Sequence, residues 1–427
     1  MRALAARLGF LSVCLVAGLL VAGCGGGGPS ADPGESSSAP SPRSGTYEIT
    51  DADFTALAAL MDDRAQALLE GRKPAFLATV DPTNSELLAE QEVFFDNVTA
   101  LPVDKLFYDV STDGFVPAKI RGNDPVVRPQ VVEHLSLRGV FDKPVGNGVA
   151  LTFVKRDGEW VLGHEEIDEV VEPQERPWFG GPIEVTQDGG LLVVTDRGAD
   201  ESSREVATSV RVHLDAVAAL LETPPGSRLL VDATSNGLAN ELSNASGENA
   251  GAVSFGVAAI DDDGNVRGLA GEVIKLNPEL VDELIGNSVL MRHELTHYLL
   301  DFGITAPIWA SEGIAEVVAE YPRLLTEAVG DAALVRDIEN RPVELTGSGI
   351  WGNDPELDYL VARATAEYLV KTYGFARYRE MLETFQRRAS GVSYGEAIVD
   401  ETLRKVYGES EAEVARHTFD LLRGLAP

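Results

Sequence analysis

His293 and His297 stand four residues apart in the segment RHELTHYLLDFG, residues 292 to 303. In an α-helix a separation of four residues is about 400° of rotation, so both imidazoles project from the same face. A lone histidine in apolar surroundings is usually a satisfied core residue, but two on one face are within reach of a single metal ion. This pair constrains the fold most, because it requires a helix that packs by its apolar side and turns its histidines toward a cleft.

The flanking residues carry the signals that begin and end such a helix. Asn287 or Ser288 can cap its start. Gly303 can take the left-handed conformation at its end, and Pro307 stands beyond. The sequence therefore predicts one helix across this segment. The side opposite the histidines is apolar and is formed by Met291, Leu295, Leu299 and Phe302.

Zinc is the metal ion that suits two imidazoles and a carboxylate. Glu294, next to the first histidine, points beside such an ion rather than at it. A general base must lie there to take a proton from a water molecule that the metal activates. The HExxH pattern is short, however, and occurs by chance in unrelated chains. A third protein ligand is needed to support the site.

The segment IWASEGIAEVVAEY, which begins at Ile308, supplies the natural third ligand in Glu312. Glu316 follows one helical turn later and could accept the free ring N–H of a ligating histidine, which raises the basicity of that histidine. The alternative is a solvated amphipathic helix with no ligand. The start of this helix just after Pro307 and Trp309 favours close packing against the histidine helix.

The pairing of HELTH with W-x-x-E-G-x-A-E resembles the gluzincin zinc metallopeptidases. The closest likeness is to the peptidase MA-like group, a bacterial branch that shares its core with thermolysin and the aminopeptidases. The resemblance covers about residues 180 to 425 and is strong across 290 to 320. It implies that His293, His297 and Glu312 bind zinc. It also implies that Glu294 is the general base and that the Glu316 carboxylate holds one of the ligands.

The resemblance extends to two further pieces of catalytic machinery. The segment GEVIKLN, residues 271 to 277, is similar to the edge strand with which gluzincins bind an extended peptide. Related enzymes stabilise the oxyanion with a tyrosine or histidine from a later helix, and MA-like chains often carry a tyrosine at the place of Tyr359. His417, in the last helix, is a weaker candidate. Tyr359 could equally be a core residue, because it continues a helical stripe with Ala362, Ala366, Leu369 and Tyr373.

The N-terminus reads as a targeting segment rather than as part of the fold. A short basic region precedes an apolar run from Leu8 to Leu20, which is shorter than a membrane-spanning helix of roughly 20 residues. The following LLVAGC resembles the bacterial lipobox, which implies a signal peptide over residues 1–23 and lipidation of Cys24. An ordinary secretory signal with an incidental cysteine is the alternative. Cys14 leaves with the signal, so neither a disulfide nor a cysteine-based zinc site is possible.

The rest of the chain divides into a tether, two α+β domains and a linker. Residues 24–45 are rich in Gly, Ser and Pro and predict a disordered tether. Residues 46–168 contain helices followed by strands, with RDG as a hairpin turn, and resemble the NTF2-like (SnoaL-like) cone fold. Such a domain could enclose a ligand or act as a spacer. Residues 169–181 predict a linker, and residues 182–427 the metallopeptidase-like domain.

The beginning of this second domain alternates strands with one long helix, which predicts a mixed sheet followed by a helical subdomain. Strand-like segments LLVVTD and RLLVDAT flank the helix, and AVSFGVAAI and LAGEVIKLN follow. The DDDGN between the last two predicts a hairpin turn rather than a calcium loop, because Ala259 occupies the place of the first ligand. His213 lies beside the apolar stripe of the helix and is expected to be structural. That stripe consists of Val206, Val210, Leu214, Val217 and Leu221.

A formal net charge of −33 makes nucleic acid and anionic lipid head groups poor partners for the surface. The leading hypothesis is a lipid-anchored zinc metallopeptidase on the extracytoplasmic face of the cell membrane, acting on a peptide or protein substrate. One alternative is a catalytically inactive pseudo-peptidase that binds a partner at the cell surface. Another is a ligand-binding protein that works through its NTF2-like domain.

Overall fold

A computed structural model describes most of the chain beyond the predicted tether. It covers residues 47–121, 124–141, 143–167, 176–226, 228–236, 251–261, 266–300, 306–323, 325, 345, 355–388 and 396–424. The predicted signal peptide, Cys24 and the tether lie outside these residues, as do Phe302, Gly303 and the predicted DDDGN turn from residue 262 to 265. Among the described helices, none combines the length and apolarity needed to cross a membrane.

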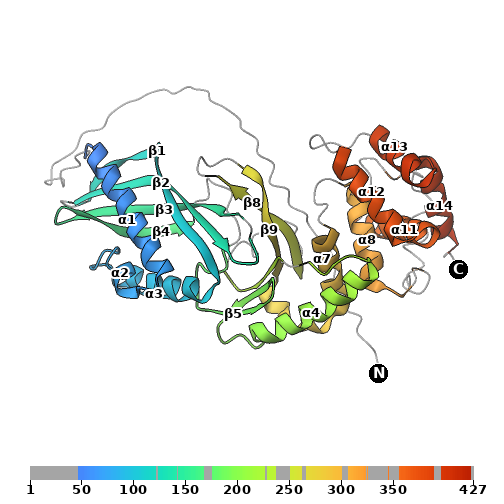
Figure 1. Ribbon diagram of the computed structural model, residues 1–427, viewed down its shortest axis with the longest axis horizontal. Coiled ribbons are helices and arrows are strands. Elements are labelled where there is room, and N and C mark those ends of the chain that lie inside the picture. The colour runs from blue at the N-terminus through green and yellow to red at the C-terminus, as the bar shows by residue number, and fades with distance from the viewer. Residues whose placement is uncertain are drawn as a thin grey trace, which may run out of the picture.

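The N-terminal unit is built from helices followed by an antiparallel meander, as the sequence predicts (Figure 1). β1 pairs with β2, β2 with β3, and β3 with β4, all antiparallel. The β3–β4 turn lies at Asp157 and Gly158, whose positive φ angles of 51° and 93° confirm the predicted hairpin. The elements are α1 (Asp51–Leu69), α2 (Lys73–Leu77), α3 (Ser85–Ala100), β1 (Val103–Arg121), β2 (Asp124–Leu137), β3 (Val145–Arg156) and β4 (Glu159–Ile167). The cone fold itself stays a prediction.

Helix α1 begins at a capping box and packs by an apolar stripe. The Thr50 side chain accepts a hydrogen bond from the Asp53 backbone N–H, and the Asp53 carboxylate accepts one from the Thr50 backbone N–H. This exchange satisfies two backbone donors at the start of the helix. Leu57, Met61, Ala65 and Leu68 are all buried.

Asp53 also joins α1 to the β3–β4 hairpin. Its buried carboxylate accepts hydrogen bonds from the Lys155 ammonium at 2.7 Å and the Trp160 indole N–H at 3.0 Å. Burial by itself would raise the pKa of Asp53, but these donors and Thr50 outweigh it and hold the pKa well below its usual value. The ionised carboxylate therefore stabilises the folded state.

Replacing Asp53 with asparagine is expected to lower the free energy of unfolding by about 2 kcal/mol at neutral pH, because the charge-assisted bonds are lost. The difference in free energy of unfolding between wild type and variant should be fully present above the unfolded-state pKa of about 4. It should shrink as the pH falls below that value toward the lowered pKa of Asp53 in the folded state. Urea unfolding of both proteins across this pH range measures the difference. Asp51→Asn, in the same helical turn but exposed, is the matched control. A constant difference down to pH 2 would contradict the assignment.

The C-terminal half contains a mixed sheet followed by a helical region, which confirms the predicted mixed α+β architecture. β6 and β7 are parallel, as are β7 and β9, whereas β5–β6 and β8–β9 are antiparallel. The strands are β5 (Ile183–Asp188), β6 (Leu191–Asp196), β7 (Leu229–Ala233), β8 (Ala252–Ile260) and β9 (Val266–Leu276). The helices are α4 (Ser203–Leu220), η1 (Pro278–Leu280), α6 (Val281–Gly286), α7 (Ser288–Leu300), α8 (Ile308–Glu320), α11 (Pro355–Tyr373), α12 (Phe375–Arg388), α13 (Glu396–Tyr407) and α14 (Glu411–Arg423).

The mixed sheet is buried on both faces, which explains its continuous apolar runs such as LLVV. On one face, Val193, Val231 and Ile274 belong to the core formed with α4 and α7. On the other face, alternate residues of the same strands belong to the core of the N-terminal unit. These alternate residues are Leu192, Val194, Leu230 and Val273.

The two predicted domains are therefore continuous rather than separated by a solvated linker. β3 pairs with β8 through Val145 and Ala259, which joins both halves in one sheet of order β1-β2-β3-β8-β9-β7-β6-β5, with β4 beside β3. The end of the predicted linker is also packed: Trp178 is fully buried in the N-terminal core, and Arg176 pairs with Glu133 at 3.1 Å. The acidic, proline-containing composition of this stretch gave no sign of that burial.

The predicted edge strand is wrong. GEVIKLN forms the second half of β9, which pairs with β8 on one side and with β7 on the other. The pairing to β7 includes a buried ion pair, in which the Lys275 ammonium lies 2.7 Å from the Asp232 carboxylate. The same ammonium donates to the Thr234 carbonyl at 2.9 Å. An apolar strand that precedes the histidine helix has the same sequence pattern whether it lies inside a sheet or at its edge.

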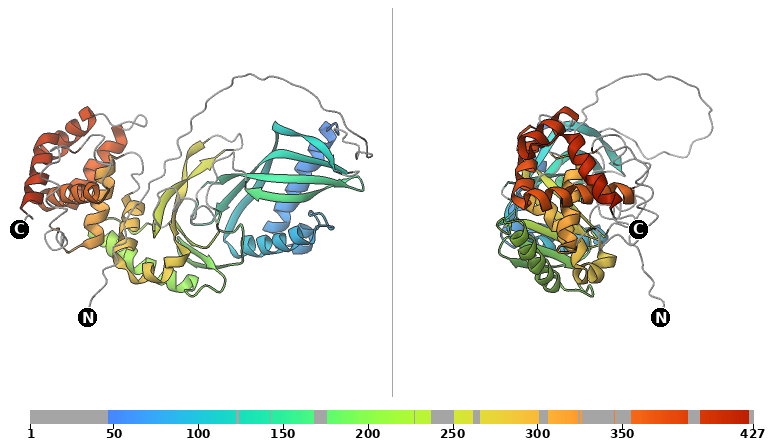
Figure 2. Two further views of the ribbon diagram at one scale, coloured as in Figure 1. Left: turned by 180° about the vertical axis from the view of Figure 1, so that it is seen from behind. Right: turned by 90° about the vertical axis from the view of Figure 1, so that its right-hand side faces the viewer.

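The helical region lies at the opposite end of the molecule from the β1–β4 meander (Figures 1 and 2). α7 and α8 connect the mixed sheet to the bundle of α11 to α14. α8 contacts α7 on one side and α11 on the other. A second apolar cluster, which includes Leu360, Ala364 and Phe419, joins α11 to α14. The site predicted from the sequence therefore falls where the sheet meets the helical region.

Candidate metal centre

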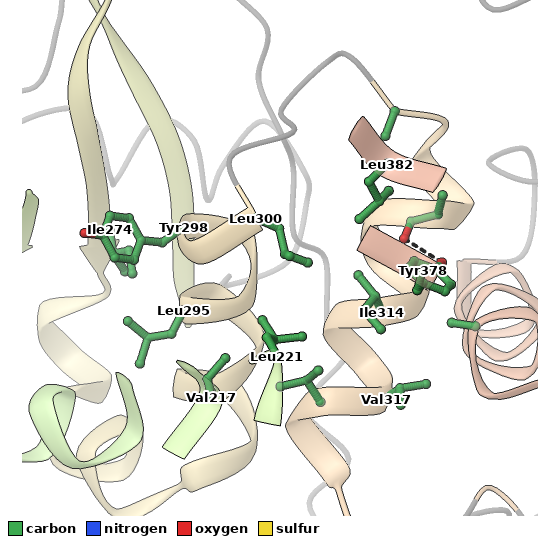
Figure 3. Packing of buried hydrophobic residues seen from close by; sticks show 14 of the residues in the cluster. Val217, Leu221, Ile274, Leu295, Tyr298, Leu300, Ile314, Val317, Tyr378 and Leu382 are labelled. Atoms are coloured by element: carbon green, nitrogen blue, oxygen red, sulfur yellow. Dashed lines mark hydrogen bonds between the residues drawn. The ribbon is translucent and has the colours of Figure 1, made fainter. Parts of the chain in front are cut away.

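Helix α7 forms as the sequence predicts and packs by its apolar side. The Asn287 side chain accepts a hydrogen bond from the Val289 backbone N–H at 3.1 Å, so Asn287 caps its start. Met291 and Leu295 are buried in the core shared with the sheet and α4. Leu295 and Tyr298 point from α7 toward Ile274 of β9 and Val217 of α4 (Figure 3). The histidines are thereby left on the side of α7 that faces α8.

Helix α8 lies between α7 and the helical region. Its apolar residues Ile314 and Val317 lie between α7 and α12, where Tyr378 and Leu382 project toward them (Figure 3). The Tyr378 hydroxyl donates a hydrogen bond to the Ala310 carbonyl at 2.8 Å, within the first turn of α8. This contact joins α12 to α8 in the turn that precedes the predicted third ligand.

Three predicted ligands come together between α7 and α8. Nε2 of His293 lies 3.1 Å from Nε2 of His297 and 3.2 Å from Oε2 of Glu312. Nε2 of His297 lies 3.5 Å from the same carboxylate oxygen. His293 and Glu312 are almost fully buried, and His297 is partly exposed. The three ligand atoms thus form a small triangle.

The dimensions of this triangle fit a zinc ion. Zinc–nitrogen and zinc–oxygen bonds of about 2.0–2.1 Å in a tetrahedron place neighbouring ligand atoms about 3.3 Å apart. The three distances of 3.1, 3.2 and 3.5 Å agree with this value. Two imidazoles and one carboxylate also form a donor set that zinc accepts, with a fourth position left for water or substrate. Among the described residues, these three make up the group that could hold a metal ion.

Two further glutamates flank the triangle. Oε1 of Glu316 lies 3.1 Å from Nδ1 of His293, on the side of the ring away from the ligand atom. At this distance the two groups form an ion pair when His293 is protonated, and Nε2 of the same ring faces the other two ligand atoms. The role of Glu316 in holding the Nδ1 proton stays a prediction. Glu294 follows His293 on α7 and is buried like it. Its role as a general base stays a prediction.

The electrostatics of the triangle show how strongly the carboxylates act on the histidines. Burial disfavours the charged form of His293, but Glu312 and Glu316 outweigh it and raise the pKa of His293 well above its usual value. Burial would raise the pKa of Glu312, but the two histidines lower it to about 2. Both shifts have the same cause, the attraction between the carboxylates and positive charge on the histidines.

The remaining predicted residues are distributed over the helical region and α4. Tyr359 is buried near the start of α11, on the helix that also buries Ala362, Ala366 and Leu369. Its role at an oxyanion stays a prediction. His417 stacks on Tyr368, and His213 is half-buried on α4, where burial and Arg292 lower its pKa. Cys24 lies outside the described residues.

Sequence reasoning missed the contacts that hold α8 in place. Tyr378 is separated from Ala310 by 68 residues, and no motif links them. Gly313, directly after Glu312, lies against α11 at very short range. The only available signal was the glycine in S-E-G-I-A, because a glycine inside a helix costs stability and often marks a close approach of two backbones.

No protein-family model matches the chain, and no curated protein matches it. Among solved structures, the chain is similar to an M1 zinc metallopeptidase mutant from Deinococcus radiodurans bound to a Tyr-Ser-Ala substrate. The similarity covers 75% of this chain and 70% of that chain, with 15% sequence identity and a TM-score of 0.31. A TM-score of this size carries no argument about function, so the functional conclusion depends on the geometry of the site.

Proposed function

We propose that this protein is a zinc metallopeptidase whose metal is held by His293, His297 and Glu312. The observation that carries the proposal is the triangle of ligand atoms, with sides of 3.1, 3.2 and 3.5 Å, built from two helices and largely buried. A buried charged cluster without a metal is costly to the fold. The spacing suits zinc, and the donor set of two imidazoles and one carboxylate is the one found in zinc peptidases.

Each residue of the site has a distinct task in the proposed reaction. When bound, zinc would polarise the scissile carbonyl and lower the pKa of the attacking water. Glu294 accepts a proton from that water and passes it to the nitrogen of the leaving amine. Glu316 keeps the Nδ1 proton of His293 in place and so fixes the orientation of the ring.

The substrate is proposed to be a peptide that adds to the edge of β8 rather than β9. Along Ala252–Val257, β8 pairs with β9, and in the described residues no strand pairs with its other side. β3 reaches β8 only near its end, at Ala259. An extended peptide can bind such an edge through backbone hydrogen bonds. α7 packs against the same strand, so a peptide on this edge would lie close to the histidine helix.

The proposal includes a location outside the cytoplasm. It rests on the LLVAGC segment, in which Cys24 would carry the lipid, and on the Gly/Ser/Pro-rich stretch of residues 25–45 as a tether. Phase partitioning of the wild type and of Cys24→Ser in Triton X-114 tests it, with the wild type expected in the detergent phase and the variant in the aqueous phase.

Metal content and hydrolysis of the purified full chain test the function. We expect one zinc per chain by mass spectrometry, together with cleavage of a peptide library that a chelator stops and added zinc restores. Zinc without cleavage of any peptide would favour the pseudo-peptidase that binds a partner at the cell surface. A wild-type chain that binds no zinc after reloading would refute the metallopeptidase.

Zinc binding is expected to tighten as the pH rises from about 6 toward the raised pKa of His293. Zinc must displace the proton on this histidine, so the apparent affinity should increase by up to about tenfold per pH unit while His293 is protonated. Competition against a chromophoric chelator measures it. In Glu316→Gln the carboxylate that helps to raise this pKa is gone, so the rise should shift to lower pH. An affinity independent of pH would contradict the role of His293.

A further inference from the structure

Helices α8 and α11 approach each other very closely at one point. A Cβ atom added to Gly313 would lie 2.3 Å from the Ala362 carbonyl oxygen and 2.8 Å from its carbonyl carbon. It would also lie 3.1 Å from Cβ of Ala366, one turn further along α11. The nearest obstacle is helix backbone, which cannot rotate away as a side chain can. Gly313 therefore lets the two helices approach each other more closely than any residue with a Cβ atom would allow.

The same turn of α8 carries the metal-binding carboxylate. Glu312 precedes Gly313 and reaches both histidines across the gap to α7. Successive residues of a helix are about 100° apart, so Glu312 faces α7 while Gly313 faces α11. The Tyr378 hydroxyl holds the Ala310 carbonyl from α12.

We infer that Gly313 is a positioning residue for the metal centre: it sets how deeply α8 packs against α11 and so places the Glu312 carboxylate at bonding distance for an ion held by His293 and His297. The inference rests on the proposed zinc site. Gly313 itself touches no ligand and acts through the position of α8.

The expected displacement is large on the scale of a metal site. To move the added Cβ from 2.3 Å to the 3.0 Å below which such contacts are essentially absent, α8 must shift by about 0.7 Å. Metal–ligand distances tolerate only about 0.2 Å. α8 also contacts α7, so a shift of α8 away from α11 changes the distances from Glu312 to the histidines of α7. Because the sides of the triangle already match the size of zinc, a change of this size should weaken zinc binding.

The test compares zinc affinity in matched variants of the full chain by chelator competition. Gly313→Ala is expected to bind zinc about 10–100-fold more weakly than the wild type, as for other residues that orient ligands. Gly286→Ala is the control, because it makes the same change in helix α6, where an added Cβ meets nothing within 4 Å. It should bind zinc as the wild type does.

A second pair of variants changes the same contact from the α11 side. It tests the inference if Gly313→Ala does not fold. Ala366→Ser enlarges the side chain that faces Gly313, and Ala364→Ser makes the same change on a buried alanine packed with Phe419 of α14. We expect weaker zinc binding in Ala366→Ser alone, with similar losses of thermal stability in both. Equal zinc affinity in the members of each pair would overturn the inference and leave the zinc site intact. Absence of zinc in the wild type would overturn the proposed function and this inference with it.

Discussion

The Glu294→Gln variant is expected to keep its zinc and to hydrolyse peptides about 10²–10⁴-fold more slowly than the wild type. Glutamine has the size of glutamate but cannot accept a proton from the attacking water. Because Glu294 is adjacent to a ligand and is not one of the three atoms of the triangle, the metal should remain bound. Zinc content and cleavage rate are measured on the same preparation.

Glu283→Gln is the matched control for this experiment, since it makes the same change on an exposed residue of α6. It should cleave at the wild-type rate. Full activity in Glu294→Gln would eliminate Glu294 as the base. Zinc binding with no activity in the wild type would instead support the pseudo-peptidase, for which this substitution should change nothing.

Glu312→Ala is expected to lose zinc, because it removes one of three protein ligands and leaves two imidazoles to hold the ion. The decrease in affinity should exceed the roughly 10–100-fold that follows from losing a residue that only orients a ligand. A thermal-unfolding series with added zinc provides a second readout. Zinc at 100 times its dissociation constant should stabilise the wild type by about 2.7 kcal/mol and the variant by almost nothing.

Two variants separate loss of the ligand from damage to helix α8. Glu320→Ala removes a glutamate from the last turn of the same helix and should retain zinc. Glu316→Gln should retain zinc with weakened affinity, because its contact is with Nδ1 of His293 rather than with the ion. Zinc retained by Glu312→Ala at wild-type affinity would show that the third ligand is a different residue.

Features that depend on near neighbours in the chain were predictable. The apolar stripe of α1, the Asp157–Gly158 hairpin and the Asn287 cap are each local: a helical period, a turn dipeptide and one side chain beside a helix start. The likeness of the two histidines to a metal site was equally local, because a spacing of four residues in any α-helix puts both on one face.

Features that depend on which segments meet were not predictable. β9 was expected at an edge, but its Lys275 lies against Asp232, 43 residues earlier, and this pairing makes it an inner strand. The stretch ending at Gly181 was expected to be a linker, but Trp178 fills the core of the N-terminal unit. Composition describes the average environment of a segment and carries no information on its partner.

The metal centre also has features that were predictable from the sequence and features that were not. The sequence alone determined that His293 and His297 share a face and that Glu316 follows Glu312 by one helical turn, because helix geometry is the same wherever the helix lies. Only the tertiary structure decided that Glu312 approaches within 3.2 Å of His293. That distance follows from how α7, α8, α11 and α12 pack, because contacts with residues far along the chain hold α8 in place. Packing at this range depends on shape rather than on local pattern.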